Sequence, residues 1–350
     1  MIVVGTRMRC AVLTDTETFA LEDRPRPEPG PDDVLVAMRH VGICGSDVHY
    51  YRHGRIGDFV VESPLVLGHE SAGEVVAVGS NVEDVAVGDE VALEPGVPCL
   101  ECDYCRQGRY NLCPDVRFMA TPPHDGAFAE YVAWPAAFAT PLPDGVSTRA
   151  GALCEPLSVG IHAVRRANVG VGDTVLVTGG GPIGMLVAEA ARAAGAAEVG
   201  LSDVVSAKLD RAEARGVDWT VDATAGNLPD RVAAHTDGEG VDAVIEASGA
   251  EPAIRSTTGV VRRGGTVVLV GLAEDGEIPL DTHDVVNREL DVHGSFRFRN
   301  TYSAAVDLLA DGAVDVEGII DFERPLDEVR AAFEQTADPD VVKGMIVVGE

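Results

Sequence analysis

A glycine-rich turn at residues 179–184 constrains the fold of this chain more than any other feature of the sequence. The motif GxGxxG directly follows the Val-rich run TVLVT and opens an Ala-rich stretch. A strand, a tight glycine turn and a helix in this order form a pyrophosphate site, because glycine lets backbone approach the phosphates at the helix N-terminus. The motif residues expected to bind a cofactor are Gly179, Gly181, Pro182, Ile183 and Gly184.

A carboxylate after the next strand-like run strengthens this reading and indicates which dinucleotide binds. Asp203 ends the run EVGLSD, about twenty residues beyond the glycines, where a carboxylate accepts hydrogen bonds from the adenosine ribose hydroxyls. It would repel a 2′-phosphate, so we expect NAD rather than NADP. Lys208 lies close by in the sequence and could soften that preference.

The order of strand-like and helix-like segments along the chain predicts two domains, with one inserted into the other. Length alone favours two domains, since 350 residues exceed the usual range of about 100 to 200. The first 150 residues read as short strands divided by Gly, Pro and Asp, whereas Val/Leu runs alternate with Ala-rich stretches after Pro156. From about Leu290 the alternation stops. We expect a β-rich domain of residues 1–157 and 291–350 and a doubly wound α/β domain with a parallel sheet at 158–290.

Four cysteines within fifteen residues predict a closed metal site. They fit the spacing CxxCxxCx7C, which lets four thiolates from one lobe converge on a tetrahedral zinc. A site with four protein ligands has no position for substrate, so this zinc would be structural. Disulfides or a redox cluster are the alternatives. The lobe consists of Cys99, Cys102, Cys105 and Cys113.

Charge excludes several classes of function. The chain has 57 acidic and 27 basic residues, a net charge of −30, and only two lysines, Lys208 and Lys343. Such a surface repels nucleic acid and anionic lipid. It is typical of halophilic proteins, because molar salt shortens the Debye length to about 3 Å and screens self-repulsion.

No apolar run approaches the ~20 residues that cross a bilayer, and we expect no export signal and a cytoplasmic protein.

Motifs along nearly the whole chain resemble the zinc-dependent medium-chain alcohol dehydrogenases. GHESAGEVVAVG is similar to the zinc signature of the wider family, while CGSDVHYY and CEPLSVGIHAVRR resemble its sorbitol and xylitol dehydrogenase branch. The resemblance implies a GroES-like β-rich catalytic domain with an inserted Rossmann domain, and two zinc ions per chain. Cys44 and His69 would bind the catalytic zinc. The third ligand stays open between Glu70 and Glu155.

The same resemblance assigns the residues around the reaction. Asp47 would fix the orientation of His69, and Ser46 and His49 resemble the proton relay of the family. Positions that approach the substrate in sorbitol dehydrogenases are Tyr50, Phe59, Phe118, Thr121, Arg297 and Phe298. The three phenylalanines could instead be core residues. Phe298 also stands where the mammalian sorbitol enzymes have a tyrosine.

The predicted function is zinc-dependent oxidation of a secondary hydroxyl of a sugar alcohol to the ketose, with hydride transfer to NAD. The alternatives are a related dehydrogenase of threonine, a diol or glucose, and, from another class, a non-catalytic NAD-binding protein. The resemblance also implies a homo-oligomer, a dimer or a tetramer.

Overall fold

The computed structural model describes residues 6–273 and 276–349, which form two compact units. Unit 1 consists of Met1–Glu155 together with Tyr302–Glu350, and unit 2 of Pro156–Thr301. The chain therefore leaves unit 1, forms unit 2 and returns, as an inserted domain requires.

Unit 1 is built on β-strands. Within its described residues the largest sheet has the strand order β12-β8-β7-β3-β20-β19, with β11 also paired to β3. Neighbours β7, β3 and β20 pair antiparallel, although they lie far apart in the sequence. The bounds are β3 Asp33–Gly42, β7 Glu70–Val78, β8 Glu90–Leu93, β11 Tyr131–Pro135, β12 Ala139–Pro141, β19 Ile320–Pro325 and β20 Lys343–Val347.

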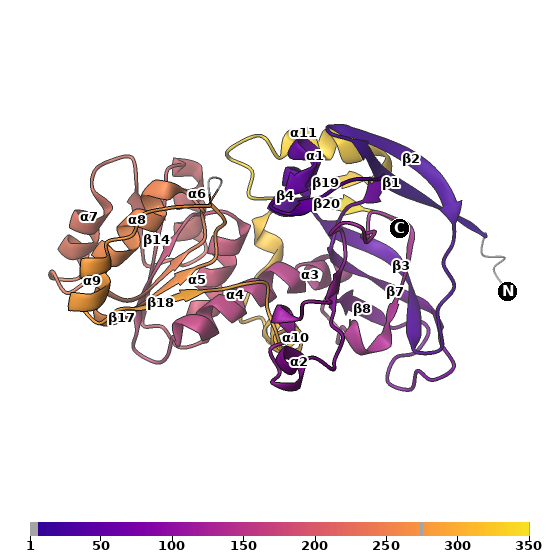
Figure 1. Ribbon diagram of the computed structural model, residues 1–350, viewed down its shortest axis with the longest axis horizontal. Coiled ribbons are helices and arrows are strands. Elements are labelled where there is room, and N and C mark those ends of the chain that lie inside the picture. The colour runs from indigo at the N-terminus through magenta and orange to yellow at the C-terminus, as the bar shows by residue number, and fades with distance from the viewer. Residues whose placement is uncertain (1–5, 274–275, 350) are drawn as a thin grey trace. The chain divides into compact units, whose positions relative to one another are not determined.

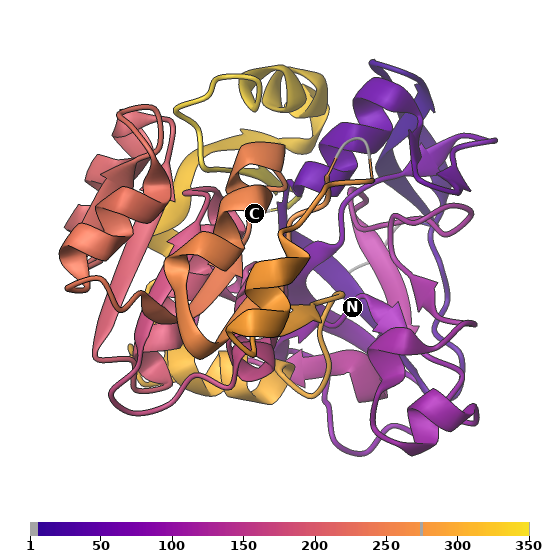
Figure 2. The same ribbon diagram turned by 60° about the vertical axis from the view of Figure 1, so that its left-hand side comes forward.

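Short helices close the sides of unit 1. Phe333 of the late helix α11 packs against Phe19 and Tyr51, so the last part of the chain shares one core with the first. Figures 1 and 2 show α11 close to α1. The helices are α1 Gly45–His53, α2 Asp103–Arg106, α3 Thr148–Ala152, α10 Tyr302–Ala310 and α11 Val329–Gln335, with β1 Arg7–Asp15, β2 Thr18–Pro25 and β6 Leu65–Val66 in a second sheet.

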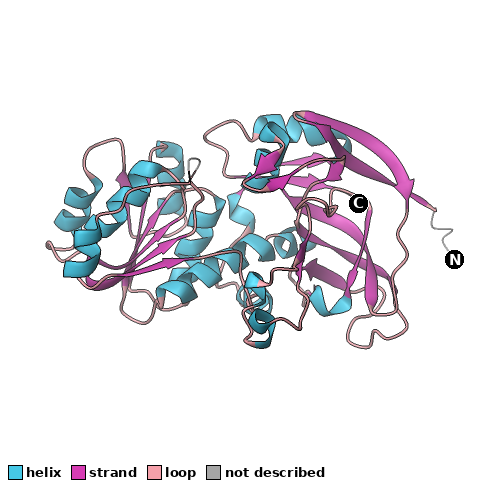
Figure 3. Cartoon of the chain, viewed as in Figure 1, coloured by secondary structure: helices cyan, strands magenta, loops and turns pink. Residues whose placement is uncertain are grey.

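Unit 2 contains a parallel sheet with the strand order β15-β14-β13-β16-β17-β18 in its described part. Figure 3 shows these strands between helices. The first strand, β13, lies between β14 and β16, so the order reverses at its carboxyl end, where such folds bind ligands. The bounds are β13 Thr174–Thr178, β14 Glu198–Asp203, β15 Trp219–Asp222, β16 Val241–Glu246, β17 Val261–Leu269 and β18 Asp291–Gly294.

In the parallel-sheet region, α4 precedes the first strand and the other helices connect successive strands. The helices are α4 Cys154–Ala167, α5 Pro182–Ala193, α6 Ser206–Ala214, α7 Leu228–His235, α8 Glu251–Val260 and α9 Thr282–Asn287. No helix among the described residues is long and apolar enough to cross a membrane.

The predicted α/β fold class is confirmed, and the strand-turn-helix at the glycines is β13 followed by α5. The compact units divide at 155/156 and 301/302, whereas the sequence pattern predicts domain boundaries at 157/158 and 290/291. The difference at the second boundary arises from β18, which pairs with β17 as the edge strand of the parallel sheet. Three of its four residues are exposed, so its sequence lacks the apolar pattern of a central strand.

Candidate functional site

Asp47 contacts both Cys44 and His69, the two residues predicted to bind the catalytic zinc. Cys44 is the N-cap of α1, and its backbone N–H donates to Asp47 Oδ2 at 3.0 Å. The other carboxylate oxygen accepts from Gly68 N at 3.0 Å and lies 3.5 Å from His69 Nδ1. One buried carboxylate thus fixes the start of α1, the chain before β7 and the ring of His69. Its contact to Nδ1 leaves Nε2 of His69 for a metal.

Glu70, the first residue of β7, lies in a buried ion pair with Lys343 of β20. The Lys343 ammonium donates to Glu70 Oε1 at 2.6 Å and to the carbonyl of Ile43 at 2.9 Å, and it also contacts Oε2. Both side chains are 1% exposed. Gly42, which pairs with Glu70 across β3 and β7, leaves the space that the carboxylate fills, since a Cβ there would overlap Oε2.

The electrostatics around these residues favour positive charge. Burial lowers the pKa of His69, but Asp47 and Cys44 raise it, and the net pKa lies well above the ordinary value. Lys343 behaves in the same way: burial lowers its pKa, and Glu70 and Cys44 raise it above normal. A cluster with this excess of negative groups is suited to a bound cation.

Cys44, His69 and Glu70 each offer one ligand atom, and the three atoms lie within 4.8 Å of one another. A thiol, an imidazole and a carboxylate are the donor types of a catalytic zinc with three protein ligands. Glu155 is buried close enough to interact with His69 and Glu70 electrostatically, and burial raises its pKa to about 7. It is not part of the described three-residue group. The geometry favours Glu70 as third ligand, with Glu155 beside it.

The four cysteines of the lobe also converge. Their sulfurs lie within 4.8 Å of one another, with Cys102 Sγ 3.5 Å and Cys99 Sγ 4.0 Å from Cys105 Sγ. Zinc–sulfur bonds of about 2.3 Å require sulfurs about 3.8 Å apart in a tetrahedron. The backbone N–H groups of Glu101 and Cys102 lower the pKa of Cys99 to about 7, which favours its thiolate, whereas burial raises the pKa of Cys105 to about 12. The set fits a structural zinc.

A buried acid joins this lobe to the main sheet of unit 1. Glu94, just after β8, accepts a hydrogen bond of 2.7 Å from Tyr110 in the lobe, and its carbonyl accepts from Trp134 Nε1 at 2.9 Å. Burial raises the pKa of Glu94 to about 7. The sequence gives no signal for this contact, because a single Glu in EPGVPC has no spacing that marks it.

In unit 2, each glycine of the motif has a distinct environment. Gly179 has a positive φ of 100°, a conformation that favours glycine. A Cβ at Gly184 would overlap the carbonyl of Gly179, so the approach of α5 to β13 requires glycine there. A Cβ at Gly181 would meet no atom of the described chain within 4 Å. The open space beside Gly181 leaves room for the close approach of the phosphates that the motif predicts.

A pocket of about 420 Å³ lies next to this turn. Asp203 borders it and accepts hydrogen bonds from Gly180 N at 2.6 Å and Val205 N at 2.8 Å, so the ribose-binding candidate is itself held in place. Lys208 lies beside Gly180. The lining comprises Thr178, Gly179, Ser202, Asp203, Val204, Ala223, Gly226, Asn227, Leu228, Pro229, Ser248, Ala250, Pro252, Ala253 and Ser256.

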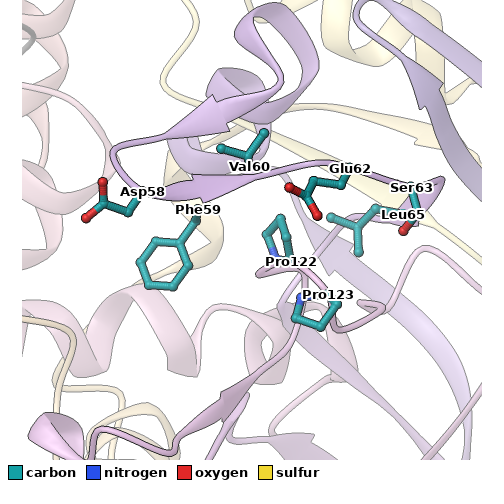
Figure 4. Close-up of a pocket in the computed structure, with 8 residues that line it drawn as sticks. All are labelled: Asp58, Phe59, Val60, Glu62, Ser63, Leu65, Pro122 and Pro123. Carbon is teal, nitrogen blue, oxygen red and sulfur yellow. The ribbon is translucent and has the colours of Figure 1, made fainter.

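The predicted substrate residues of unit 1 fall into different environments. The Phe118 ring lies 5.7 Å from the His69 ring, centroid to centroid, and Thr121 follows three residues later, where its N–H donates to the carbonyl of Phe118. Tyr50 is buried in the core. Phe59 is 48% exposed and lines a 360 Å³ pocket with Pro122, shown in Figure 4, whose lining contains none of the three metal-ligand candidates.

The two predicted substrate residues of unit 2 lie on the segment after β18. Phe298 is buried, whereas the Arg297 guanidinium lies over the ring of Phe296, 4.8 Å from its centroid. Arg165 and Arg166 of α4 hold this segment by donating to the carbonyls of Asn300 and Gly294. The substrate roles of all six residues stay predictions.

Comparison with known proteins identifies the family. Residues 30–144 match the alcohol dehydrogenase GroES-like domain, and residues 182–311 match the zinc-binding dehydrogenase domain. The chain is 42% identical over 332 residues to the sorbitol dehydrogenase of Bacillus subtilis, covering 95% of this chain and 94% of that protein. The chain belongs to the zinc-dependent medium-chain alcohol dehydrogenases.

Other members of the family agree with this assignment. The human sorbitol dehydrogenase is 45% identical over 318 residues, covering 90% of this chain and 88% of that protein. A protein of Sinorhizobium meliloti 1021, solved bound to NADP, superposes with a TM-score of 0.92 at 36% identity, covering 98% of this chain and all of that one. The predicted family is confirmed, and zinc and a nicotinamide dinucleotide are the cofactors of this chain.

Proposed function

We propose that the protein oxidises a secondary hydroxyl of a sugar alcohol to a ketose and passes the hydride to NAD. The observation that carries this proposal is the convergence of Cys44, His69 and Glu70 in a chain that is 42% identical to a sorbitol dehydrogenase over almost its whole length. When bound there, zinc supplies Lewis-acid polarisation of the substrate oxygen, and NAD supplies the hydride acceptor. Asp203 supports NAD over NADP, because its carboxylate would repel a 2′-phosphate.

The residues of the chain itself hold these groups and handle the proton. Cys44, His69 and Glu70 would hold zinc, and Asp47 keeps the first two in register. Ser46 and His49 lie on one face of α1, three residues apart. Ser46 is half-buried and His49 is exposed, so a proton that leaves the substrate hydroxyl can reach solvent through this helix face.

A substrate panel tests the proposed activity. We expect NADH to form with xylitol, sorbitol, ribitol or arabinitol faster than with threonine, 2,3-butanediol or glucose, and the purified protein to contain about two zinc ions per chain. Turnover confined to threonine, a diol or glucose would keep the mechanism and overturn the substrate class. No turnover, with about one zinc per chain, would indicate a non-catalytic NAD-binding protein.

We further propose that the protein is a salt-adapted, cytoplasmic homo-oligomer. The net charge of −30 supports salt adaptation, and clustered free thiols fit a reducing compartment. The exposed edge strand β18 and the nearby Phe296, 50% exposed, support self-association. We expect a higher melting temperature in roughly 2 M than in roughly 0.1 M KCl. Equal stability in both salts would contradict salt adaptation.

We also expect the protein to sediment as a dimer or tetramer. A monomer at micromolar concentration would contradict the proposed self-association.

A further inference from the structure

Glu246 is a fully buried carboxylate at the point where the parallel sheet reverses its strand order. It is the last residue of β16, which pairs directly with β13, and its side chain is 0% exposed. The neighbouring strand end carries Thr178 and Gly179, both of which line the 420 Å³ pocket. A carboxylate out of water at this position is costly unless donors surround it. The groups that donate hydrogen bonds to Glu246 therefore indicate which part of the chain it positions.

Two of the three donor residues, Thr178 and Ser248, line the pocket. Glu246 Oε1 accepts from Ser248 N at 2.8 Å and Gly249 N at 3.0 Å, and Gly249 N also lies 3.2 Å from Oε2. The Ser248 hydroxyl donates to Oε1 as well and accepts from Ala250 N at 3.1 Å. Thr178 Oγ1 lies 3.5 Å from Oε1 on the other side. Of these partners, Thr178, Ser248 and Ala250 line the pocket, whereas Glu246 does not.

A glycine from a third segment of the chain also lies close to the carboxylate. Gly271, in the chain after β17, lies so close that a Cβ there would come 2.7 Å from Glu246 Oε2. Its N–H donates to the Glu246 carbonyl at 3.1 Å. A side chain at position 271 would crowd the carboxylate. Through Ser248 N and Gly249 N, Glu246 holds the turn between β16 and α8.

We propose that Glu246 is a positioning residue for the dinucleotide, acting through the Thr178 and Ser248–Ala250 walls of the pocket. This inference rests on the proposed function, since it takes the pocket to be the adenosine side of the NAD site. A neutral amide keeps the shape of the side chain, but it replaces one acceptor oxygen with an NH2 group that faces the N–H of Gly249. The turn would then lose the charge-assisted hydrogen bonds that order it.

The test compares Glu246→Gln with the unchanged holoenzyme, using AMP and NAD as probes. We expect the Kd of both probes to rise about tenfold, while kcat at saturating NAD changes less than about twofold and the zinc content stays the same. AMP lacks nicotinamide, so its Kd reports the adenosine side of the pocket without any turnover. Thr257→Val is the matched control, because among the described residues this buried hydroxyl bonds only to the carbonyl of Ile254, within α8. It should leave the Kd of AMP unchanged.

Two further outcomes separate the inference from the proposed function. If the unchanged protein binds neither AMP nor NAD, the proposed function fails. If it binds both and Glu246→Gln binds them equally well, with or without a lower melting temperature, the positioning role fails. Should Glu246→Gln not fold, Ser248→Ala carries the test: we expect about a threefold weaker AMP affinity, and unchanged affinity would overturn the proposal.

Discussion

Lys343→Met is expected to destabilise the zinc-free protein by about 3–5 kcal/mol, because it leaves Glu70 as an uncompensated buried charge. The side chains of Lys343 and Glu70 are each 1% exposed, and the Lys343 ammonium donates a hydrogen bond to Glu70 Oε1. Chemical denaturation after dialysis against a chelator measures the effect. Zinc should restore much of the loss, since the metal supplies the positive charge that Lys343 no longer provides.

The chain offers its own control for this experiment. Lys208 is the other lysine in the sequence and is half-buried beside Gly180. Lys208→Met removes the same ammonium from a more exposed position and should change the stability by less than about 0.5 kcal/mol. A zinc-free Lys343→Met protein that is as stable as the unchanged one would show that Glu70 does not depend on this ion pair.

Glu70→Gln and Glu155→Gln are expected to separate the two carboxylates that the sequence alone left as alternatives. After mild chelation, Glu70→Gln should retain about one zinc ion per chain, in the cysteine lobe, whereas Glu155→Gln should retain about two. Turnover should fall by at least about a hundredfold in Glu70→Gln, since the loss of a supporting group alone costs 10- to 100-fold. Metal analysis and initial rates give both quantities.

Glu70→Gln also leaves Lys343 without its carboxylate, so a double variant is needed. If Glu70 only neutralises Lys343, then Glu70→Gln with Lys343→Met restores the charge balance and the second zinc ion returns. If Glu70 is a ligand, the double variant stays at about one zinc per chain. Retention of two zinc ions by Glu70→Gln, with loss from Glu155→Gln, would reverse the assignment.

Features that depend on a few consecutive residues could be predicted from the sequence. The cysteine lobe needs only its own loop to bring four sulfurs together, and the glycine turn needs only β13 and α5. The charge of −30 required no structure at all. The edge strand β18 was not recognised, because exposed strands lack the apolar run that marks a central one.

The sequence by itself therefore determined the family, the two-part α/β fold and the local metal and pyrophosphate motifs. Only the tertiary structure placed Lys343 against Glu70, because that contact depends on β20 and β7 lying on either side of β3, across most of the chain length. The same is true of Glu246, whose side-chain partners come from the end of β13 and from the turn before α8. Local patterns record the backbone conformation that a segment needs, whereas a buried charge is explained only by the neighbours that folding brings to it.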